Sequence, residues 1–419
     1  MQITLAKGHD SINFFVPEEK ILGLLYGKEV PSLSEESVAR SISAGIRDHA
    51  PADIAALKTA IIIPDDTRLW ARGDVYVPVI LQSLFDLGVP AANVNIIIAL
   101  GTHADIAAER FAALAGRFSV EHVEILNSAN RNEQRLVHLG ETRRKVPIQL
   151  TTEVVDADHI IIYGGVLHHM TAGYGGGRKY IFPGVGGYDA IQKNHSLAMC
   201  DDGSPHPNVR QMQLQGNPVN EDLEEIAELV LRSRSCTYAA VAANGRGEIF
   251  HAEVGPLQQT FQNSCTMLDE VCCVSVLQKA DFALISTGGH RADGQLYQAT
   301  KALFNAVGVV KEGGAIVFVA GCSEGSGNDI FAHTLLTYKN NKNGLGQKLA
   351  STFNMPAYVA FRVLDILDRF EVSLVSDLSC QQTVAFGFNY VEDLQNYVNN
   401  LQGSGYIIPF AENVLPVIG

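Results

Sequence analysis

The sequence has few charged residues, and positively charged residues are the scarcer kind. Only 18% of its 419 residues are charged, and 31 Lys and Arg residues stand against 45 Asp and Glu residues, for a net charge of −14. Proteins that bind nucleic acids through phosphates need a basic face, so this balance argues against a nucleic-acid partner. The hydrophobic content of 47% excludes a disordered chain and is typical of a well-packed globular enzyme.

Long apolar runs are absent as well. No stretch approaches the roughly 18 consecutive apolar residues that a membrane-spanning helix needs. The opening residues, MQITLAKGHD, contain no apolar core of a signal peptide. We therefore expect a soluble, cytoplasmic protein without a membrane partner.

Cysteine is sparse and irregularly placed. The seven cysteines are odd in number, scattered along the chain, and never spaced as C-x-x-C. Disulfide frameworks and structural zinc sites both depend on regular cysteine spacing. The cysteines are therefore expected to be reduced residues of the core.

Two common nucleotide-binding motifs are missing. In the segment GGGRKY, Arg178 precedes Lys179 and Tyr180 follows it, whereas a Walker A loop ends in Gly-Lys-Ser or Gly-Lys-Thr. No G-x-G-x-x-G lies between an expected strand and helix with an acidic residue about 20 positions later. The second absence argues against a nicotinamide-dependent dehydrogenase.

What the chain does contain is a regular alternation of short apolar runs and amphipathic segments. Strand-like runs at 59–63 and 94–100 alternate with helical segments such as 79–87, and 120–126 is expected to be a further strand. A second alternating pattern begins near residue 271. Alternation of this kind predicts right-handed βαβ units and mainly parallel sheets.

The length of 419 residues exceeds what one hydrophobic core usually supports. We therefore predict two α/β domains with largely parallel sheets and an active-site cleft between them. The N-terminal domain is expected to cover residues 1–270, and the C-terminal domain residues 271–403.

The most unusual part of the sequence is the stretch 168–196, HHMTAGYGGGRKYIFPGVGGYDAIQKNHS. It follows an apolar run at 160–163 that predicts a buried strand. Its glycines permit positive φ angles and let backbone N–H groups approach a ligand closely. Arg178 and Lys179 add positive charge that suits a phosphate.

Near the end of this stretch, His195 falls on the same helical face as Tyr188 and Ile191, so we expect it to point inward. An ordinary glycine-rich turn and a hydrogen-bonded core histidine are the alternative interpretation of the same pattern.

Polar residues follow three expected strands of the first domain: Asp65-Asp66-Thr67-Arg68, Gly101-Thr102-His103 and the 168–196 stretch. Because ligands of open parallel sheets bind beyond the carboxyl ends of the strands, we expect these residues to meet at one edge. In the second domain, Gln298 and Lys301 are spaced i, i+3 on an expected helix and can face the same site. For Lys301, a solvated helix face is the alternative interpretation.

Together these residues resemble the nickel-dependent lactate racemase family, whose members racemise or epimerise 2-hydroxy acids with a nickel-pincer nucleotide. The resemblance covers nearly the whole chain. The family's D-x-T-R motif is matched by residues 65–68 and its G-T-H motif by residues 101–103. Its H-x9-K-x15-H spacing and its Y-Q-x-x-K motif are matched by His169, Lys179 and His195 and by residues 297–301.

The resemblance implies a role for each matched residue. His195 would be the protein's nickel ligand, and Lys179 would be the residue that some members join covalently to the nucleotide. His103 and His169 would be paired acid/base residues on opposite sides of the substrate. The substrate would also contact Arg68, Tyr297, Gln298 and Lys301, and the cofactor would also contact Asp65, Thr67, Gly175, Gly176 and Gly177.

The same resemblance implies the reaction and the partners. The substrate would be a small, lactate-like 2-hydroxy acid, racemised or epimerised through hydride transfer and a keto acid intermediate. Enzymes that make and load the cofactor would be the partners. The resemblance further implies that residues 404–419 return to the first domain.

The match has two departures. Leu69 and Trp70 follow the D-x-T-R motif, where family members often have prolines, and this change would reshape the pocket wall. His168 lies beside His169, and in an extended segment the two side chains face opposite ways. The spacing selects His169.

Two other functions stay open on the sequence. A nicotinamide-dependent 2-hydroxy acid dehydrogenase would reduce added NAD in the presence of substrate. A non-catalytic nucleotide-binding protein would carry the cofactor and exchange no stereochemistry.

Overall fold

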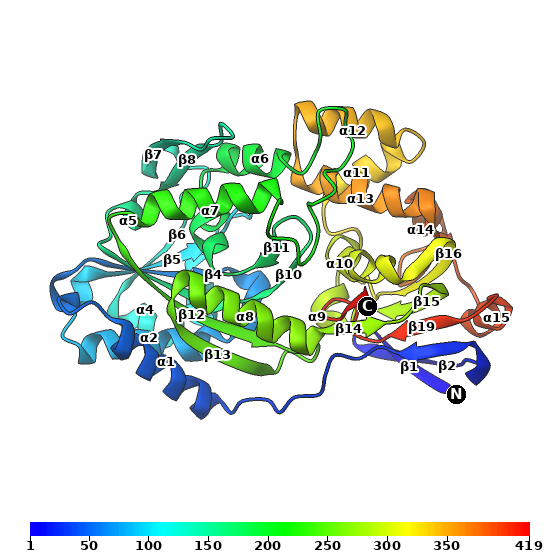
Figure 1. The fold of residues 1–419 in the computed structure, drawn as a ribbon, viewed down its shortest axis with the longest axis horizontal. Helices are drawn as coiled ribbons and strands as arrows, with labels where there is room; N and C mark the ends of the chain where they lie inside the picture. The colour runs from blue at the N-terminus through cyan, green and yellow to red at the C-terminus, as the bar shows by residue number, and fades with distance from the viewer. The chain divides into compact units, whose positions relative to one another are not determined.

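The computed structural model describes residues 1–419, which form two compact units (Figure 1). Unit 1 comprises Met1–Glu29, Met199–His206 and Glu270–Gly419, and unit 2 comprises Val30–Ala198 and Pro207–Asp269. None of the helices combines the length and the apolar character that crossing a membrane requires.

The core of unit 2 is a six-stranded sheet in the order β13-β12-β9-β4-β5-β6. Neighbouring strands are parallel except β12 and β13. Every residue of β4 and β9 is buried, as the central strands of a sheet covered on both faces require. The strands are β4 (Thr59–Pro64), β5 (Val94–Ala99), β6 (Glu124–Asn127), β9 (His159–Gly165), β12 (Ser235–Ala243) and β13 (Ile249–Pro256).

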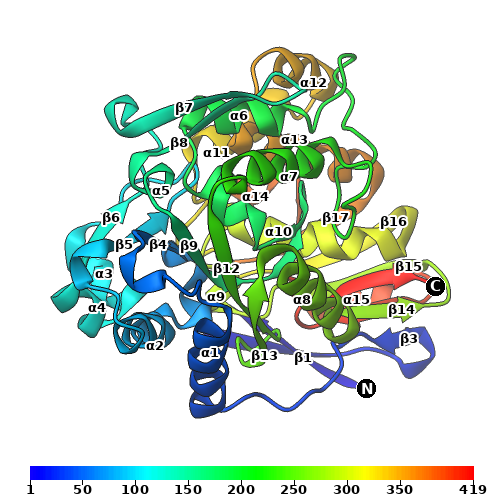
Figure 2. The same cartoon turned by 60° about the vertical axis from the view of Figure 1, so that its left-hand side comes forward.

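Helices cover both faces of this sheet, with α1 and α2 on one side and α6 and α7 on the other (Figures 1 and 2). In α1, Ser34 caps the helix by accepting the Ser37 N–H, and Val38, Ile42 and Ile46 form the buried stripe. The helices are α1 (Glu35–His49), α2 (Gly73–Asp86), α3 (Phe111–Ala115), α4 (Arg117–His122), α5 (Thr152–Val155), α6 (Tyr188–Ser196), α7 (Pro218–Leu231) and α8 (Leu257–Cys272).

Two small antiparallel ladders complete unit 2. One pairs β7 (Leu136–Glu141) with β8 (Pro147–Thr151), and the other pairs β10 (Leu167–His169) with β11 (Gly173–Gly175). A short π-helical turn, Tyr180–Gly184, follows the second ladder.

Unit 1 contains a parallel six-stranded sheet in the order β18-β17-β16-β15-β19-β3. The β1–β2 hairpin packs Leu5 and Phe14 onto this sheet beside Leu284 and Val317. The strands are β1 (Gln2–Lys7), β2 (Asp10–Phe15), β3 (Ile21–Leu24), β14 (Cys273–Val276), β15 (Ala280–Ser286), β16 (Val310–Val319), β17 (Glu371–Val375), β18 (Asn389–Tyr390), β19 (Gly405–Ile408) and β20 (Leu415–Ile418).

The helices of unit 1 follow the strands in alternation. They are α9 (His290–Asp293), α10 (Leu296–Ala306), α11 (Asp329–Tyr338), α12 (Lys342–Ser351), α13 (Met355–Arg369), α14 (Cys380–Ala385) and α15 (Leu394–Asn400). The alternating pattern thus confirms the predicted fold class of two α/β parts with mostly parallel sheets.

One predicted strand is wrong in part. Residues 120–126 were expected to form a strand, but residues up to His122 form α4 and only Glu124–Asn127 form β6. The helix is favoured by two i, i+4 pairs, the Arg117–Glu121 ion pair and the stack of His122 on Phe118 with ring centroids 4.2 Å apart.

The chain termini also differ from the expected arrangement. Residues 404–419 were expected in the first domain, but β19 hydrogen-bonds to β15 and to β3 in the sheet of unit 1. Because β3 belongs to this sheet, the first 29 residues also lie in unit 1 rather than with the N-terminal sheet. Backbone pairing between distant segments decides both placements.

His159, at the start of β9, generates a prediction about stability. The side chain is 1% exposed, and burial lowers its pKa from 6.5 to about 4, although the Ser235 hydrogen bond opposes the shift. Between these values the unfolded chain binds a proton that the folded chain does not, so the free energy of unfolding falls as the pH drops. Glutamine does not titrate, so this part of the fall should be absent from His159→Gln. In urea unfolding experiments, we expect the free energy of unfolding of the variant to fall by roughly 3 kcal/mol less between pH 7 and pH 4 than that of the original chain.

The exposed His138 on β7 provides the matched control. His138→Gln should leave the pH dependence of the unfolding free energy as in the original chain. Identical pH profiles for His159→Gln and the original chain would contradict the assignment.

Candidate active site

The carboxyl ends of three adjacent strands of unit 2 form the edge on which the predicted residues gather. Strand register pairs Ile62 with Ile162 and Pro64 with Ala99. Continuing the register by one to three residues brings Asp65 level with Gly165 and with Leu100. Since neighbouring strands lie about 4.8 Å apart, the D-x-T-R and G-T-H motifs start side by side.

Asp65 and His103 form the first cluster at this edge. The Asp65 side chain caps the turn after β4 by accepting the Thr67 N–H at 3.1 Å, and its other oxygen is hydrogen-bonded to His103 Nδ1. The Asp65 side chain is 7% exposed, whereas the His103 side chain is 52% exposed. The buried acid therefore holds an imidazole that reaches solvent.

The charge state of Asp65 sets the tautomer of His103. Burial raises the pKa of Asp65, but the hydrogen bond and charge of His103, the charge of Arg68 and the Thr67 hydroxyl outweigh burial and leave the pKa lowered. An ionised carboxylate can only accept, so His103 Nδ1 carries the donated proton. In the neutral ring, Nε2 then presents a lone pair.

The backbone around His103 is held by Gly184 and Asn130, whose part in the site the sequence did not predict. Gly101 adopts φ of 57° and donates its N–H to the Gly184 carbonyl at 2.9 Å. The Asn130 side chain donates to the carbonyls of Gly101 and His103, both at 2.8 Å. Nothing local in the sequence links Asn130 to the G-T-H turn, 27 residues away.

The β10–β11 ladder separates the neighbouring histidines His168 and His169. His168 Nε2 lies 2.8 Å from Asp269 Oδ1 on α8, and the Tyr174 hydroxyl donates to the other Asp269 oxygen at 2.6 Å. His168 and Tyr174 are cross-strand partners, so Asp269 binds both strands of the ladder. His169 consequently faces the opposite way, as alternation along a strand requires.

His169 lies beside Lys179. Its Nδ1 accepts the backbone N–H groups of Thr171 at 3.2 Å and Ala172 at 3.3 Å. The Thr171 hydroxyl, which can donate or accept, is also 3.2 Å from Nδ1, and an ammonium group can only donate to Nε2. That nitrogen is 2.8 Å from Lys179 Nζ.

The three glycines Gly175, Gly176 and Gly177 are buried and closely packed. A Cβ on Gly176 would lie 2.8 Å from the Gly165 carbonyl oxygen, and one on Gly177 would lie 2.7 Å from the Phe261 ring. Both glycines have positive φ angles, 96° and 54°. Packing against the protein explains these glycines by itself, so their contact with a cofactor stays a prediction.

Arg178 is buried beneath the glycine segment instead of lining its outer surface. The side chain is 4% exposed and lies over the Phe261 ring at 4.3 Å. Its guanidinium donates to Asn220 Oδ1 and to the carbonyls of Ala172, Tyr174 and Gly176. Burial lowers the pKa of Arg178 to about 10, which still leaves the group charged at neutral pH.

His195 lies on α6 and is 7% exposed, as its predicted inward position requires. Burial and the charge of Lys179 together lower its pKa from 6.5 to about 3. The imidazole is therefore neutral at physiological pH, the form in which histidine binds a metal. Within unit 2, Lys179 is electrostatically coupled to His195 and in hydrogen-bond contact with His169.

The remaining predicted residues, Tyr297, Gln298 and Lys301, lie on α10 of unit 1. The Tyr297 ring packs edge-on against Phe331 with centroids 5.4 Å apart, and Gln298 and Lys301 are half-buried one turn apart.

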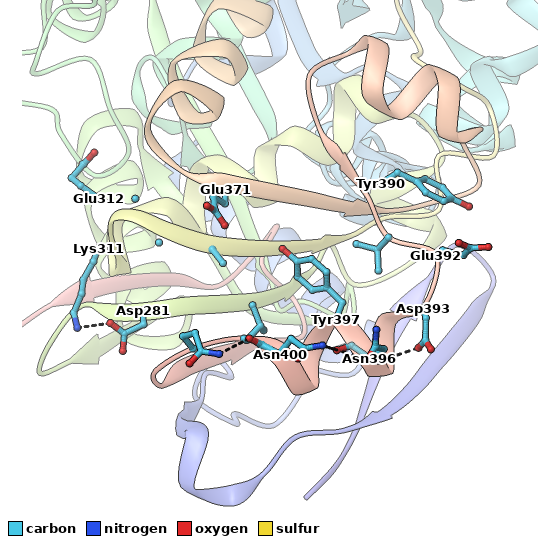
Figure 3. A pocket seen from close by; sticks show the side chains of 16 residues that line it. Asp281, Lys311, Glu312, Glu371, Tyr390, Glu392, Asp393, Asn396, Tyr397 and Asn400 are labelled. Carbon is cyan, nitrogen blue, oxygen red and sulfur yellow. Dashed lines mark hydrogen bonds and ion pairs between the residues drawn. The ribbon is translucent and has the colours of Figure 1, made fainter.

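A cavity of about 710 Å³ in unit 1 contains none of the predicted residues (Figure 3). Its lining includes Asp281 near the start of β15 and Glu371 at the start of β17, so it lies at the amino ends of the strands. Figure 3 shows the Lys311–Asp281 ion pair among exposed acidic side chains at its rim. Ligands of open parallel sheets bind at the carboxyl ends of the strands, which is the opposite edge. The cavity is therefore not the candidate active site.

Comparison with protein families matches two adjacent domain models to the chain. The Lactate racemase N-terminal domain matches residues 7–206, and the Lactate racemase C-terminal domain matches residues 276–403.

Two relatives have sequence similarity to this chain over most of their length. A lactate racemase from Thermoanaerobacterium thermosaccharolyticum is 26% identical over 334 residues, covering 78% of this chain and 76% of the relative. A lactate racemase from Lactiplantibacillus plantarum is 26% identical over 316 residues, covering 75% of this chain and 72% of the relative.

Solved structures show the same fold. The lactate racemase apoprotein from T. thermosaccharolyticum superposes with a TM-score of 0.87 at 22% identity and full coverage of both chains. A protein from Thermotoga maritima superposes with a TM-score of 0.68 at 15% identity, covering 94% of this chain and 100% of the other.

The buried guanidinium predicts that Arg178→Met destabilises the protein. The substitution keeps an apolar stem over Phe261 but removes the Arg178 donors to Asn220 Oδ1 and to the carbonyls of Ala172, Tyr174 and Gly176. We expect the free energy of unfolding to fall by roughly 3 kcal/mol or more, measured by urea titration.

Arg143 provides the control, because its side chain is 89% exposed. Arg143→Met should change the unfolding free energy by no more than about 0.5 kcal/mol. Equal effects of the two substitutions would show that Arg178 does not hold the glycine segment.

Proposed function

Because the chain belongs to the lactate racemase family and is an isomerase, we propose that it interconverts the enantiomers of lactate or a closely similar small 2-hydroxy acid. The observation that carries this proposal is the carboxyl edge of the unit 2 sheet. There the Asp65–His103 pair and the His169–Lys179 pair lie on adjoining segments, with His195 coupled to Lys179.

The proposed chemistry follows from the weak acidity of the α C–H bond of a 2-hydroxy acid. Removing that hydrogen as a hydride, while a base removes the hydroxyl proton, converts the substrate into a keto acid. Returning hydride and proton to the other face of the keto acid gives the opposite enantiomer, so no net oxidation takes place. When bound, the nickel-pincer nucleotide that the family resemblance implies would supply the hydride acceptor.

His103 is suited to the role of base. Asp65 accepts the proton of Nδ1, which leaves the Nε2 lone pair available to a substrate hydroxyl at the exposed side of the ring. After proton transfer, the buried carboxylate of Asp65 stabilises the positive imidazole. His169 is proposed as the second acid/base group, because its Nδ1 is held by backbone N–H groups and its Nε2 points to Lys179.

The residues present fit the implied cofactor. The neutral, buried imidazole of His195 is a suitable metal ligand, and Lys179 provides the amine for a covalent link. Asp65, Thr67 and the glycines at 175–177 are proposed as further cofactor contacts. Arg68 is proposed to bind the substrate carboxylate, with Tyr297, Gln298 and Lys301 as substrate contacts contributed by α10.

The proposal predicts racemisation that depends on both histidines. Protein produced together with the cofactor's biosynthetic enzymes should convert either enantiomer of lactate into the racemate, followed by chiral chromatography. His103→Ala and His169→Ala should each lower kcat by about 10²-fold or more, the usual contribution of a general base.

His138→Ala, on the exposed β7 strand, is the control and should retain full activity. Unchanged kcat in both active-site variants would reject the paired-base role. Reduction of added NAD during turnover would instead support a dehydrogenase, and cofactor-loaded protein without any exchange would support a binding protein.

A second prediction concerns the metal. His195→Ala should lose nickel from protein purified after production with the biosynthetic enzymes, because no other neutral imidazole is proposed as its ligand. Nickel analysis and intact mass would be measured on the same sample, and the mass would also show whether Lys179 carries the nucleotide. Full nickel retention in the variant would remove His195 from the ligand role.

A further inference from the structure

The first two turns of α7 hold three polar side chains that each contact a different segment of the site. These residues are Asn217, Asn220 and Asp222, and all three are buried. None of them belongs to the D-x-T-R, G-T-H or H-x9-K-x15-H patterns.

Asn217, the cap of α7, is linked to His169. Its Nδ2 donates to the Thr171 carbonyl at 2.9 Å, while its Oδ1 accepts the N–H groups of Val219 and Asn220. Thr171 in turn donates its N–H to His169 Nδ1. Asn217 therefore holds Thr171, and Thr171 holds the His169 ring.

Asn220 is linked to Lys179. Its Oδ1 accepts Arg178 Nε at 2.8 Å, and its Nδ2 donates to the Leu214 carbonyl and to Glu224. Arg178 immediately precedes Lys179. The Arg178 guanidinium therefore anchors to α7 the residue that precedes Lys179, the proposed site of covalent attachment of the cofactor.

Asp222 is linked to His195. Its two oxygens accept Asn194 Nδ2 at 2.9 Å and the Thr142 hydroxyl at 2.6 Å, and the side chain is fully buried. Asn194 immediately precedes His195 on α6. Asp222 thus joins α6 to α7 and to the turn of the β7–β8 hairpin.

The helix geometry explains how one short element reaches these segments. Residues two apart on an α-helix point about 200° apart, so Asn220 and Asp222 face different neighbours. Buried, hydrogen-bonded side chains on a helix have few alternative rotamers, and the distances between their partners are therefore fixed. Catalytic groups need such support, because a displacement of about 1 Å can cost 10²-fold in rate.

We propose that the first two turns of α7 set the relative positions of His169, Lys179 and His195, with Asp222 as the positioning residue for His195. This inference rests on the proposed function for its kinetic consequence, but the placement of the His195 ring can be measured without catalysis.

The test compares Asp222→Ala with the conservative Asp222→Asn. The alanine variant removes both acceptors, whereas an asparagine amide can accept from Asn194 and donate to the Thr142 oxygen, so the network can re-form. Glu228→Ala is the matched control, because Glu228 is exposed on the same helix. The cofactor-free proteins, labelled with isotopic histidine, report the imidazole resonances of His195, and cofactor-loaded proteins report kcat and KM for lactate.

We expect Asp222→Ala to shift the His195 resonances and to lower kcat by about 10²-fold with KM unchanged within about twofold. Asp222→Asn should restore both to near the original values, and Glu228→Ala should change neither. If Asp222 only stabilised the fold, Asp222→Ala would lower the unfolding midpoint without lowering kcat selectively over KM. If Asp222→Ala does not fold, Asn194→Ala breaks the same link from the α6 side and should give the same shift.

A folded Asp222→Ala or Asn194→Ala protein with unaltered His195 resonances and kcat would overturn the inference. Failure of the original cofactor-loaded chain to racemise lactate would reject the proposed function instead. In that case, the His195 resonances of the cofactor-free variants still decide whether Asp222 positions the ring.

Discussion

One buried guanidinium maintains the shape of the segment on which the candidate site depends. Arg178 donates to the carbonyls of Ala172, Tyr174 and Gly176 and to Asn220, and none of these partners is a carboxylate. A buried cation is costly unless its donors are satisfied, so these carbonyls must turn inward toward it. Arg178 therefore ties the backbone from Ala172 to Gly176 to Asn220 on α7.

A second constraint is the register of the unit 2 sheet. The parallel pairing of β9, β4 and β5 places Gly165, Asp65 and Leu100 level with one another, so the turns that follow them share one edge. The π-helical turn after Lys179 docks on this edge through the bond from the Gly101 N–H to the Gly184 carbonyl. The two constraints bring the three segments that follow β4, β5 and β9 to the same edge of the sheet.

The parts of this arrangement that sequence patterns predicted are those with local causes. Apolar runs identified β4, β5 and β9, and the polar residues after each strand then pointed to Asp65, His103 and the 168–196 stretch because parallel strands share an edge. The inward position of His195 followed from helical spacing. These inferences need only the periods of strands and helices.

The contacts that support the site lie beyond such patterns, since they join residues far apart in the chain. Arg178 meets Asn220 after 42 residues, and His168 meets Asp269 after 101 residues. The pairing of β19 with β3 is more distant still and decides where residues 404–419 lie. A charged residue in a glycine-rich stretch suggested a phosphate site, and only the fold reveals that Arg178 is bonded internally.

The two histidines proposed as acid/base groups differ in what holds them. A carboxylate accepts the proton of His103 Nδ1 and stabilises a positive ring, whereas backbone N–H groups donate to His169 Nδ1 and disfavour one. In its neutral form, His103 presents a lone pair at Nε2, whereas Nε2 of His169 faces the Lys179 amine.

A racemase nevertheless cannot favour one direction overall. The two enantiomers of its substrate have equal free energies in solution, so kcat/KM must be the same for both. Microscopic reversibility meets this condition, because both directions cross the same transition states, and Asp65 stabilises the positive His103 ring in either direction. The unequal environments of the two rings are therefore compatible with racemisation, and Lys179, 2.8 Å from Nε2 of His169, lies at the second ring.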